Sequence, residues 1–122
     1  MPIIDVEIVE AAGTPRGAGL AQVLGNELGR VLGAAPGGVW LRLRWLPADD
    51  YAENHSSPRA LEHPVFVEVQ QRQPPEGARL TSEVMAITDA VARVLQRPPE
   101  RVHVCYGPAA AGRQAFGGRL VR

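Results

Sequence analysis

The amino-acid sequence predicts a single domain of the α/β (α+β) class, in which two β-α-β units share a four-stranded mixed sheet with both helices on one face. Three observations predict this fold. The chain has 122 residues, of which 45% are hydrophobic, and that is enough for one sizeable core. Short segments recur at a spacing of about sixty residues, which indicates a duplicated unit. Each half also shows the patterns of a strand, a helix and a second strand, in that order.

The repeat is clearest in the strands. Pro2–Ile8 is echoed by Pro64–Val69, and Leu41–Pro47 by Val102–Pro108. A polar crossover loop at 49–63 lies between the halves. The repeat predicts one domain over 1–122, with β-α-β repeats at about 2–47 and 64–108 and a C-terminal arm, either a hairpin or a partner-docking segment, at 109–122.

The first unit opens with a strand in which apolar residues alternate with acidic ones, the period-two pattern of a half-buried strand. Thr14 and Pro15 then give a helix-start signal, a hydroxyl N-cap followed by proline at the first helical position. Gly25 and Gly29 weaken the helix by up to about 1 kcal/mol each, so packing must hold it. One apolar helical face is predicted from the spacing of Leu20, Val23, Leu24, Leu28, Val31 and Leu32.

The remaining elements follow the same plan. A turn-rich stretch leads to the second strand at 40–45, and alternating valines predict a third at 65–71. Thr81 or Ser82 is expected to cap the second helix, whose apolar face carries five residues. Two prolines end it before the last strand at 102–106. The apolar face consists of Val84, Ile87, Val91, Val94 and Leu95.

The sheet face turned away from the helices is expected to be polar. One interpretation is a solvated face, which mixed sheets often have. The other is that acidic strands of one copy meet the basic strand of another inside an oligomer. The residues on this face are Asp5, Glu7, Arg42, Arg44, Glu68, Gln70, His103 and Cys105.

Composition excludes several classes of function. Thirteen acidic and thirteen basic residues cancel, so no net charge favours nucleic acid or an anionic membrane. All basic residues are arginine, which excludes a lysine Schiff base and a P-loop. The single cysteine, Cys105, excludes an internal disulfide and fits a reducing compartment. With no apolar stretch of membrane-spanning length and no basic leader, a cytoplasmic location is expected.

Pro2 is the first candidate for chemistry because it follows the initiator methionine. Removal of Met1 would leave a free secondary amine on an immobile ring. An α-amino group titrates near about 8, and burial or nearby arginines lower its pKa further. Such an amine is suited to act as a general base near neutral pH. The alternative is that Met-Pro is an ordinary start without a catalytic role.

Several segments together resemble the tautomerase superfamily, which includes 4-oxalocrotonate tautomerase, cis-3-chloroacrylic acid dehalogenase and macrophage migration inhibitory factor. They are Pro2–Glu10, the Thr14-Pro15 pair, Arg101–Tyr106 and the duplicated plan over the full chain. The resemblance implies a tautomerase/MIF-like fold, a homotrimer whose barrel buries the polar sheet face, a cofactor-independent reaction and a catalytic Pro2 near a subunit boundary. Pro64 is internal and has no free amine, so each chain would hold one site.

The resemblance also implies which arginines bind substrate. Superfamily substrates carry carboxylates, which bidentate guanidinium groups recognise. Arg72 matches an arginine that the decarboxylase and dehalogenase members place after this strand, the alternative being an exposed strand-end charge. A second arginine just beyond is not matched, and Arg79 is a weak substitute. The other arginines of 4-oxalocrotonate tautomerase are not matched either, although Arg42 or Arg44 could reach the same pocket.

Three further residues match pocket-lining positions. His103 and Cys105 fall where related enzymes place aromatic or polar side chains beside the proline. Tyr51 matches an aromatic residue of a superfamily tautomerase whose chain is about half as long. Alternatively, His103 is a polar residue in the barrel, Cys105 is a small buried side chain and Tyr51 is a loop residue without a binding role. The histidines lack metal-ligand spacing, so no metal is expected. The dehalogenase's glutamate falls near Gln114 or Ala115 and its helix histidine falls near Gly29, which argues against efficient dehalogenation.

The sequence therefore predicts a cytoplasmic, homotrimeric, cofactor-independent tautomerase that acts on small 2-hydroxy-enol or 2-oxo carboxylates. Pro2 would be the base, Arg72 would hold a carboxylate, and Arg42, Arg44 or His103 would stabilise the enolate oxygen. One alternative keeps the pocket but makes cationic Pro2 a general acid for hydration, decarboxylation or weak dehalogenation. Another is a non-catalytic ferredoxin-like or tautomerase-like binding module.

Overall fold

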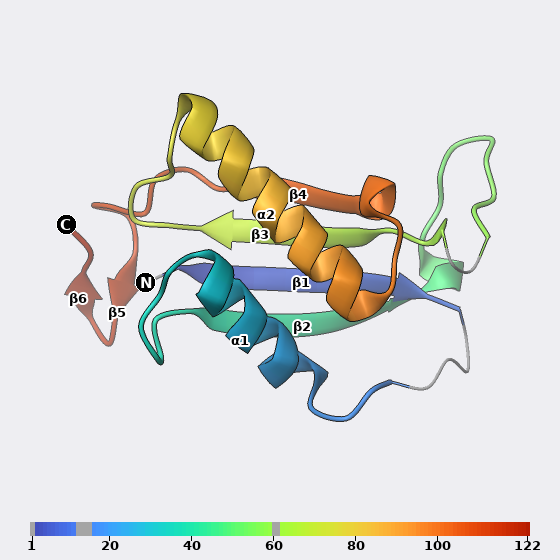
Figure 1. Ribbon diagram of the computed structural model, residues 1–122, viewed down its shortest axis with the longest axis horizontal. Helices are drawn as coiled ribbons and strands as arrows, with labels where there is room; N and C mark the ends of the chain where they lie inside the picture. Colours follow the sequence, from blue (N-terminus) through green and yellow to red (C-terminus); the bar gives the residue numbers. More distant parts are fainter. Residues whose placement is uncertain (1, 12–15, 60–61) are drawn as a thin grey trace.

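The computed structural model describes residues 2–11, 16–59 and 62–122. It contains one four-stranded mixed sheet with two helices on one face, which confirms the predicted fold class (Figure 1). The elements in chain order are β1 (Ile3–Glu10), α1 (Leu20–Val31), β2 (Trp40–Pro47), the short 3-10 helix η1 (Ala48–Asp50), β3 (Val65–Gln70), α2 (Gly77–Leu95), the short 3-10 helix η3 (Pro99–Arg101), β4 (Val102–Tyr106), β5 (Ala115–Phe116) and β6 (Arg119–Leu120).

The sheet order is β2-β1-β3-β4. β1 runs parallel to β2, and β3 runs parallel to β4, while the two central strands are antiparallel, with Val6 opposite Val67. As a result, β1 and β2 begin, and β3 and β4 end, at the same end of the sheet. We call it the Pro2 end, because Pro2 immediately precedes β1 there.

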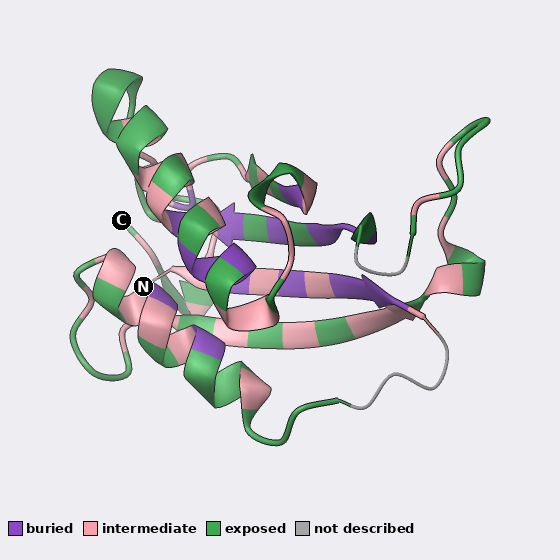
Figure 2. Ribbon diagram, turned by 45° about the vertical axis from the view of Figure 1, so that its right-hand side comes forward, coloured by how far each residue is buried: buried purple, intermediate pink, exposed green. Residues whose placement is uncertain are grey.

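The core lies between the sheet and the helices. Figure 2 shows burial concentrated on β1, β3 and the sheet-facing sides of both helices, as the alternating strand pattern predicts. Val23 departs from the prediction, because it is 50% exposed on the outer side of α1. β2, an edge strand, contains no fully buried residue, although Leu41, Leu43 and Trp45 are partly buried and pack against the core. The fully buried apolar side chains include Ile4, Val6, Ile8, Leu24, Leu28, Val65, Val67, Val69, Ile87 and Val91.

Both predicted helix starts are wrong. α1 begins at Leu20, after Gly19, which adopts a left-handed conformation that glycine accepts without strain. The predicted cap, Thr14-Pro15, lies outside the described residues. α2 begins at Gly77, so the predicted caps Thr81 and Ser82 lie inside the helix. The Thr81 hydroxyl instead donates to the Gly77 carbonyl oxygen at 3.3 Å, a bond typical of threonine within a helix.

The C-terminal arm forms a hairpin, one of the two alternatives that the sequence left open. β5 and β6 pair antiparallel, with Phe116 opposite Arg119. The Phe116 ring packs edge-on against Trp40, with ring centroids 4.9 Å apart. Figure 1 shows the start of β1 and the C-terminus beside this hairpin, so the arm lies at the Pro2 end of the sheet.

The end of α2 carries a residue in an unfavourable conformation. Gln96 follows the helix with φ 54°, in the left-handed region, and its N–H donates to the Ala92 carbonyl. We expect Gln96→Gly to raise the free energy of unfolding by about 1 kcal/mol, because glycine adopts this conformation without a steric penalty. Urea denaturation measures the change. Gln73→Gly is the matched control, since its φ is not positive, and an equal gain there would contradict the explanation.

Candidate active site

Pro2 is half-buried and held at the start of β2. Its carbonyl oxygen accepts a hydrogen bond from the Trp40 N–H at 3.0 Å. In the parallel register Ile3 lies beside Trp40, so Pro2 lies beside the residue that precedes it, Val39. The main chain at Pro2 is therefore fixed by the sheet edge, which is a favourable position for a group that must reach a substrate accurately.

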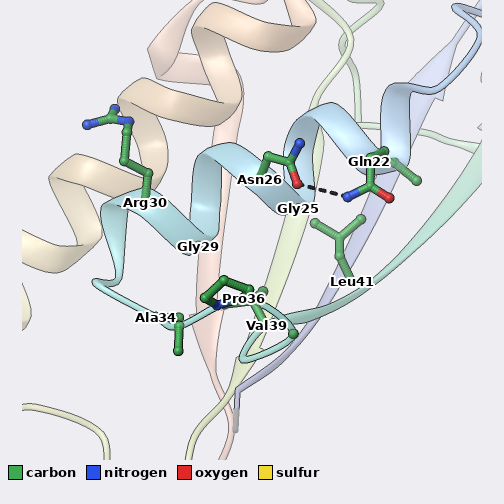
Figure 3. A pocket seen from close by; sticks show the side chains of 12 residues that line it. Gln22, Gly25, Asn26, Gly29, Arg30, Ala34, Pro36, Val39 and Leu41 are labelled. Atoms are coloured by element: carbon green, nitrogen blue, oxygen red, sulfur yellow. Dashed lines mark hydrogen bonds between the residues drawn. The ribbon is translucent and has the colours of Figure 1, made fainter.

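A groove of about 490 Å³ opens next to this position, between α1 and the segment 34–41 (Figure 3). Val39 lines the groove, which connects it to the neighbourhood of Pro2. On the helix side the lining alternates small residues with polar ones. Gln22 and Asn26 are joined by a hydrogen bond of 2.8 Å from Nε2 to Oδ1. Arg30 also lines the groove, but its Nε donates to Glu27 Oε1 at 3.2 Å.

These groove residues were missed in the sequence analysis, although a signal for them existed. Gln22, Asn26 and Arg30 recur at four-residue spacing, which places them on one helical face. The sequence does not show which element that face is turned toward. Only the position of the segment 34–41 reveals that the face borders an open space near Pro2.

Arg72 lies exposed just beyond β3 at the Pro2 end. The backbone there is fixed, because the Arg72 carbonyl accepts the Ala111 N–H at 3.2 Å. The Arg72 Nε donates to the main-chain oxygen of Arg122. Among the described residues its terminal nitrogens make no hydrogen bond, which leaves them free to donate to a carboxylate.

A second cavity, of about 260 Å³, lies on the sheet face opposite the helices. It brings together three predicted site residues, Arg44, His103 and Cys105, beside acidic groups of β1 and β3. Phe66 also lines this cavity and is 38% exposed. Phe66 was not among the residues predicted for the polar face.

Arg42 is already paired within the chain. Its Nε and a terminal nitrogen donate to the two carboxylate oxygens of Asp5 at 2.6 and 2.8 Å. The hydrogen bond from Arg42 and the positive charges of Arg42 and Arg44 lower the pKa of Asp5. This acidic–basic contact forms between adjacent strands of one chain, whereas one interpretation of the sequence placed it between copies.

Tyr51 lies toward the other end of the sheet. Its hydroxyl donates to Glu53 Oε2 at 2.5 Å, and its ring is 6.1 Å from Phe66, which is 5.7 Å from His103. Burial, followed by the carboxylate of Glu53, raises the pKa of Tyr51.

One chain does not bring this cluster to the catalytic candidate. His103 pairs with Phe66, and Phe66 with Glu7, five residues along the strand from Pro2. That separation is about 16 Å along β1. Within one chain the predicted site residues therefore form two groups, Pro2 with Arg72 at one end and Tyr51, His103, Cys105, Arg42 and Arg44 on the open sheet face.

Known proteins resemble this chain in fold but not in sequence. No protein-family model matches the chain, and no curated protein matches it in sequence. Solved structures do match over nearly the whole length. A wild-type fused 4-OT in a symmetric trimer is 18% identical with a TM-score of 0.73, covering 98% of this chain and 94% of its own. A macrophage migration inhibitory factor homologue from Prochlorococcus marinus is 18% identical with a TM-score of 0.70, covering 98% and 99%.

A third match is a protein inactivated by 2-oxo-3-pentynoate, which is 16% identical with a TM-score of 0.70 and covers 98% of this chain and 94% of its own. The chain has the fold of these proteins. The resemblance to the tautomerase superfamily that the sequence predicts is thus confirmed at the level of the fold.

One further polar cluster lies under α2 at the Pro2 end. The Tyr106 hydroxyl donates to Glu83 Oε2 at 2.5 Å, and Gln71 Nε2 donates to Glu83 Oε1 at 3.2 Å. Burial and the hydrogen bond to Glu83 raise the pKa of Tyr106. Glu83 of α2 therefore links the helix to the ends of β3 and β4 through these two hydrogen bonds.

In the described ranges, no three or more histidine, cysteine, aspartate or glutamate side chains are grouped so as to hold a metal ion. Of the helices that the structure describes, none is long and apolar enough to cross a membrane.

Proposed function

We propose that the chain is a member of the tautomerase superfamily that interconverts the 2-hydroxy-enol and 2-oxo forms of carboxylic acids without a cofactor. Pro2, freed by removal of Met1, is the general base. The observation that carries the proposal is the position of Pro2, half-buried immediately before the central strand β1 and beside Val39, which lines the groove of about 490 Å³.

The chemistry needs one proton carrier and one anchor. Neutral Pro2 takes the proton from the enol hydroxyl and, as the cation, returns it to the neighbouring carbon, so the reaction is a net isomerisation. Arg72 holds the substrate carboxylate through its terminal nitrogens, and the bidentate geometry fixes the orientation of the reacting carbons. Pro2 and Arg72 lie at the same end of the sheet, which supports this pairing.

A homotrimer completes the site in this proposal. The exposed sheet face, which includes Phe66, and the edge strand β2, which has no fully buried residue, favour burial against another copy. The solved fused 4-OT is a symmetric trimer with the same fold. A neighbouring copy would bring its own Arg44, His103, Cys105 and Tyr51 toward Pro2, where a cation or histidine stabilises the enolate oxygen.

Turnover of phenylenolpyruvate and 2-hydroxymuconate by the purified protein tests the proposal, together with the mass of the N-terminus and sedimentation equilibrium. We expect ketonisation by a trimer that lacks Met1. A rate that increases with pH through the Pro2 titration supports neutral Pro2 as the general base, whereas a rate that decreases supports cationic Pro2 as a general acid. Absence of turnover by protein with a free Pro2 would contradict tautomerase activity.

A further inference from the structure

We propose that the groove beside α1 accepts an extended, uncharged side chain of a monocarboxylic substrate, and that Gly25 and Gly29 are the specificity-determining residues that keep it open. The inference rests on the proposed function, because it takes Pro2 and Arg72 as the reacting end of the site. It adds the size and polarity of the substrate.

The helix itself gives no structural reason for glycine at positions 25 and 29. Glycine weakens a helix interior relative to alanine, and both residues lie within α1. A Cβ at Gly29 would meet nothing within 4 Å, and one at Gly25 would only touch the Leu41 Cβ at 4.0 Å. Neither residue has a positive φ. Neither backbone conformation nor close packing therefore requires glycine at these positions.

What the glycines do is leave space. Both line the groove, together with Ala34, Pro36 and Leu41 on the opposite side. Figure 3 shows the helix passing over these residues with no side chain between them at positions 25 and 29. A large side chain at either position would project into the groove and reduce the volume that a ligand can occupy.

The volume exceeds what a three-carbon acid needs. The groove has a volume of about 490 Å³, whereas a three-carbon 2-oxo acid has only six non-hydrogen atoms. The volume also lies within the range of about 300–1,000 Å³ typical of small-molecule sites. A substrate that fills the groove therefore carries a side chain longer than the reacting end.

The polarity of the groove favours an uncharged side chain. Gln22 and Asn26 present amides, and their single mutual hydrogen bond leaves the Asn26 amide protons and the Gln22 carbonyl for a ligand. Arg30 is hydrogen-bonded to Glu27, and in Figure 3 it points away from Pro36 and Val39. The amides fit a hydroxyl, amide or carbonyl group, while Arg72 provides the cation for one carboxylate.

The experiment compares Gly29→Leu with wild type on two 2-oxo acids, pyruvate and an acid with a six-carbon side chain ending in a primary amide. Enolisation is followed by exchange of the C3 protons for deuterium, and binding by titration calorimetry. We expect Gly29→Leu to lower kcat/KM and affinity for the long acid at least tenfold, with pyruvate changed less than twofold. Gly17→Leu, outside the groove, is the matched control.

Stability separates specificity from misfolding. Gly29→Ala fits the available space and should raise Tm by about 4 °C, because alanine favours the helix. The proposal is overturned if Gly29→Leu affects both acids equally, or if wild type prefers pyruvate. Binding of the long acid without exchange at C3 would support the groove as a side-chain site and contradict tautomerase activity. Exchange of pyruvate alone would support tautomerase activity and contradict the groove as a side-chain site.

Discussion

Pro2→Ala is expected to lower kcat for ketonisation by about 10²–10⁴-fold, the usual contribution of a positioned general base. After removal of Met1 the variant still has an α-amino group, which titrates near about 8. That primary amine lacks the ring, so it rotates freely and is more strongly hydrated. The measurement is the initial rate of ketonisation over a range of pH, with the N-terminal mass determined for each preparation.

The fold gives this substitution a clear control. The contact at residue 2 that joins β1 to β2 is made by a main-chain carbonyl, which alanine retains. Tm and the oligomeric state should therefore be unchanged. Pro47→Ala, at the exposed end of β2, is the matched proline variant and should keep full activity. If Pro2→Ala ketonises the enol as fast as wild type, Pro2 is not the base and another group carries the proton.

The strands of this chain could be predicted from sequence because burial on one face imposes a period of two. Ile4, Val6 and Ile8 all lie in the core, as their spacing indicates. The helix starts could not be predicted, because cap signals are local and compete with one another. Gly19, not Thr14, precedes α1, since glycine accepts the left-handed conformation at that point.

The candidate site was predictable only in part. Pro2 was indicated by its position after Met1 and then by the resemblance, Arg72 by the resemblance alone, and both lie at the same end of the sheet. The partner of Arg42 depends on strand register, which pairs it with Asp5 and which the sequence does not fix. The groove depends on missing side chains at Gly25 and Gly29, and in sequence these residues indicate only a weak helix.

Arg72→Gln is expected to lower kcat/KM by about 10²-fold, mainly through KM. A hydrogen bond to a charged group is worth about 1.5–3 kcal/mol, so loss of a bidentate contact to a carboxylate accounts for such a change. Glutamine keeps one amide donor and similar reach but no charge. Steady-state kinetics with a monocarboxylic enol measure the effect.

Salt dependence distinguishes a binding role of Arg72 from a structural one. If its charge holds the substrate, wild-type KM rises with ionic strength because ions screen the attraction, and KM of Arg72→Gln changes little. Arg79→Gln is the matched control, since Arg79 is exposed in the first turns of α2, only seven residues further along the chain. A larger loss of kcat/KM in Arg79→Gln than in Arg72→Gln would indicate that Arg79 binds the carboxylate. Because Arg72 also donates to the Arg122 main-chain oxygen, a lower Tm with unchanged KM would instead make it an anchor for the C-terminal hairpin.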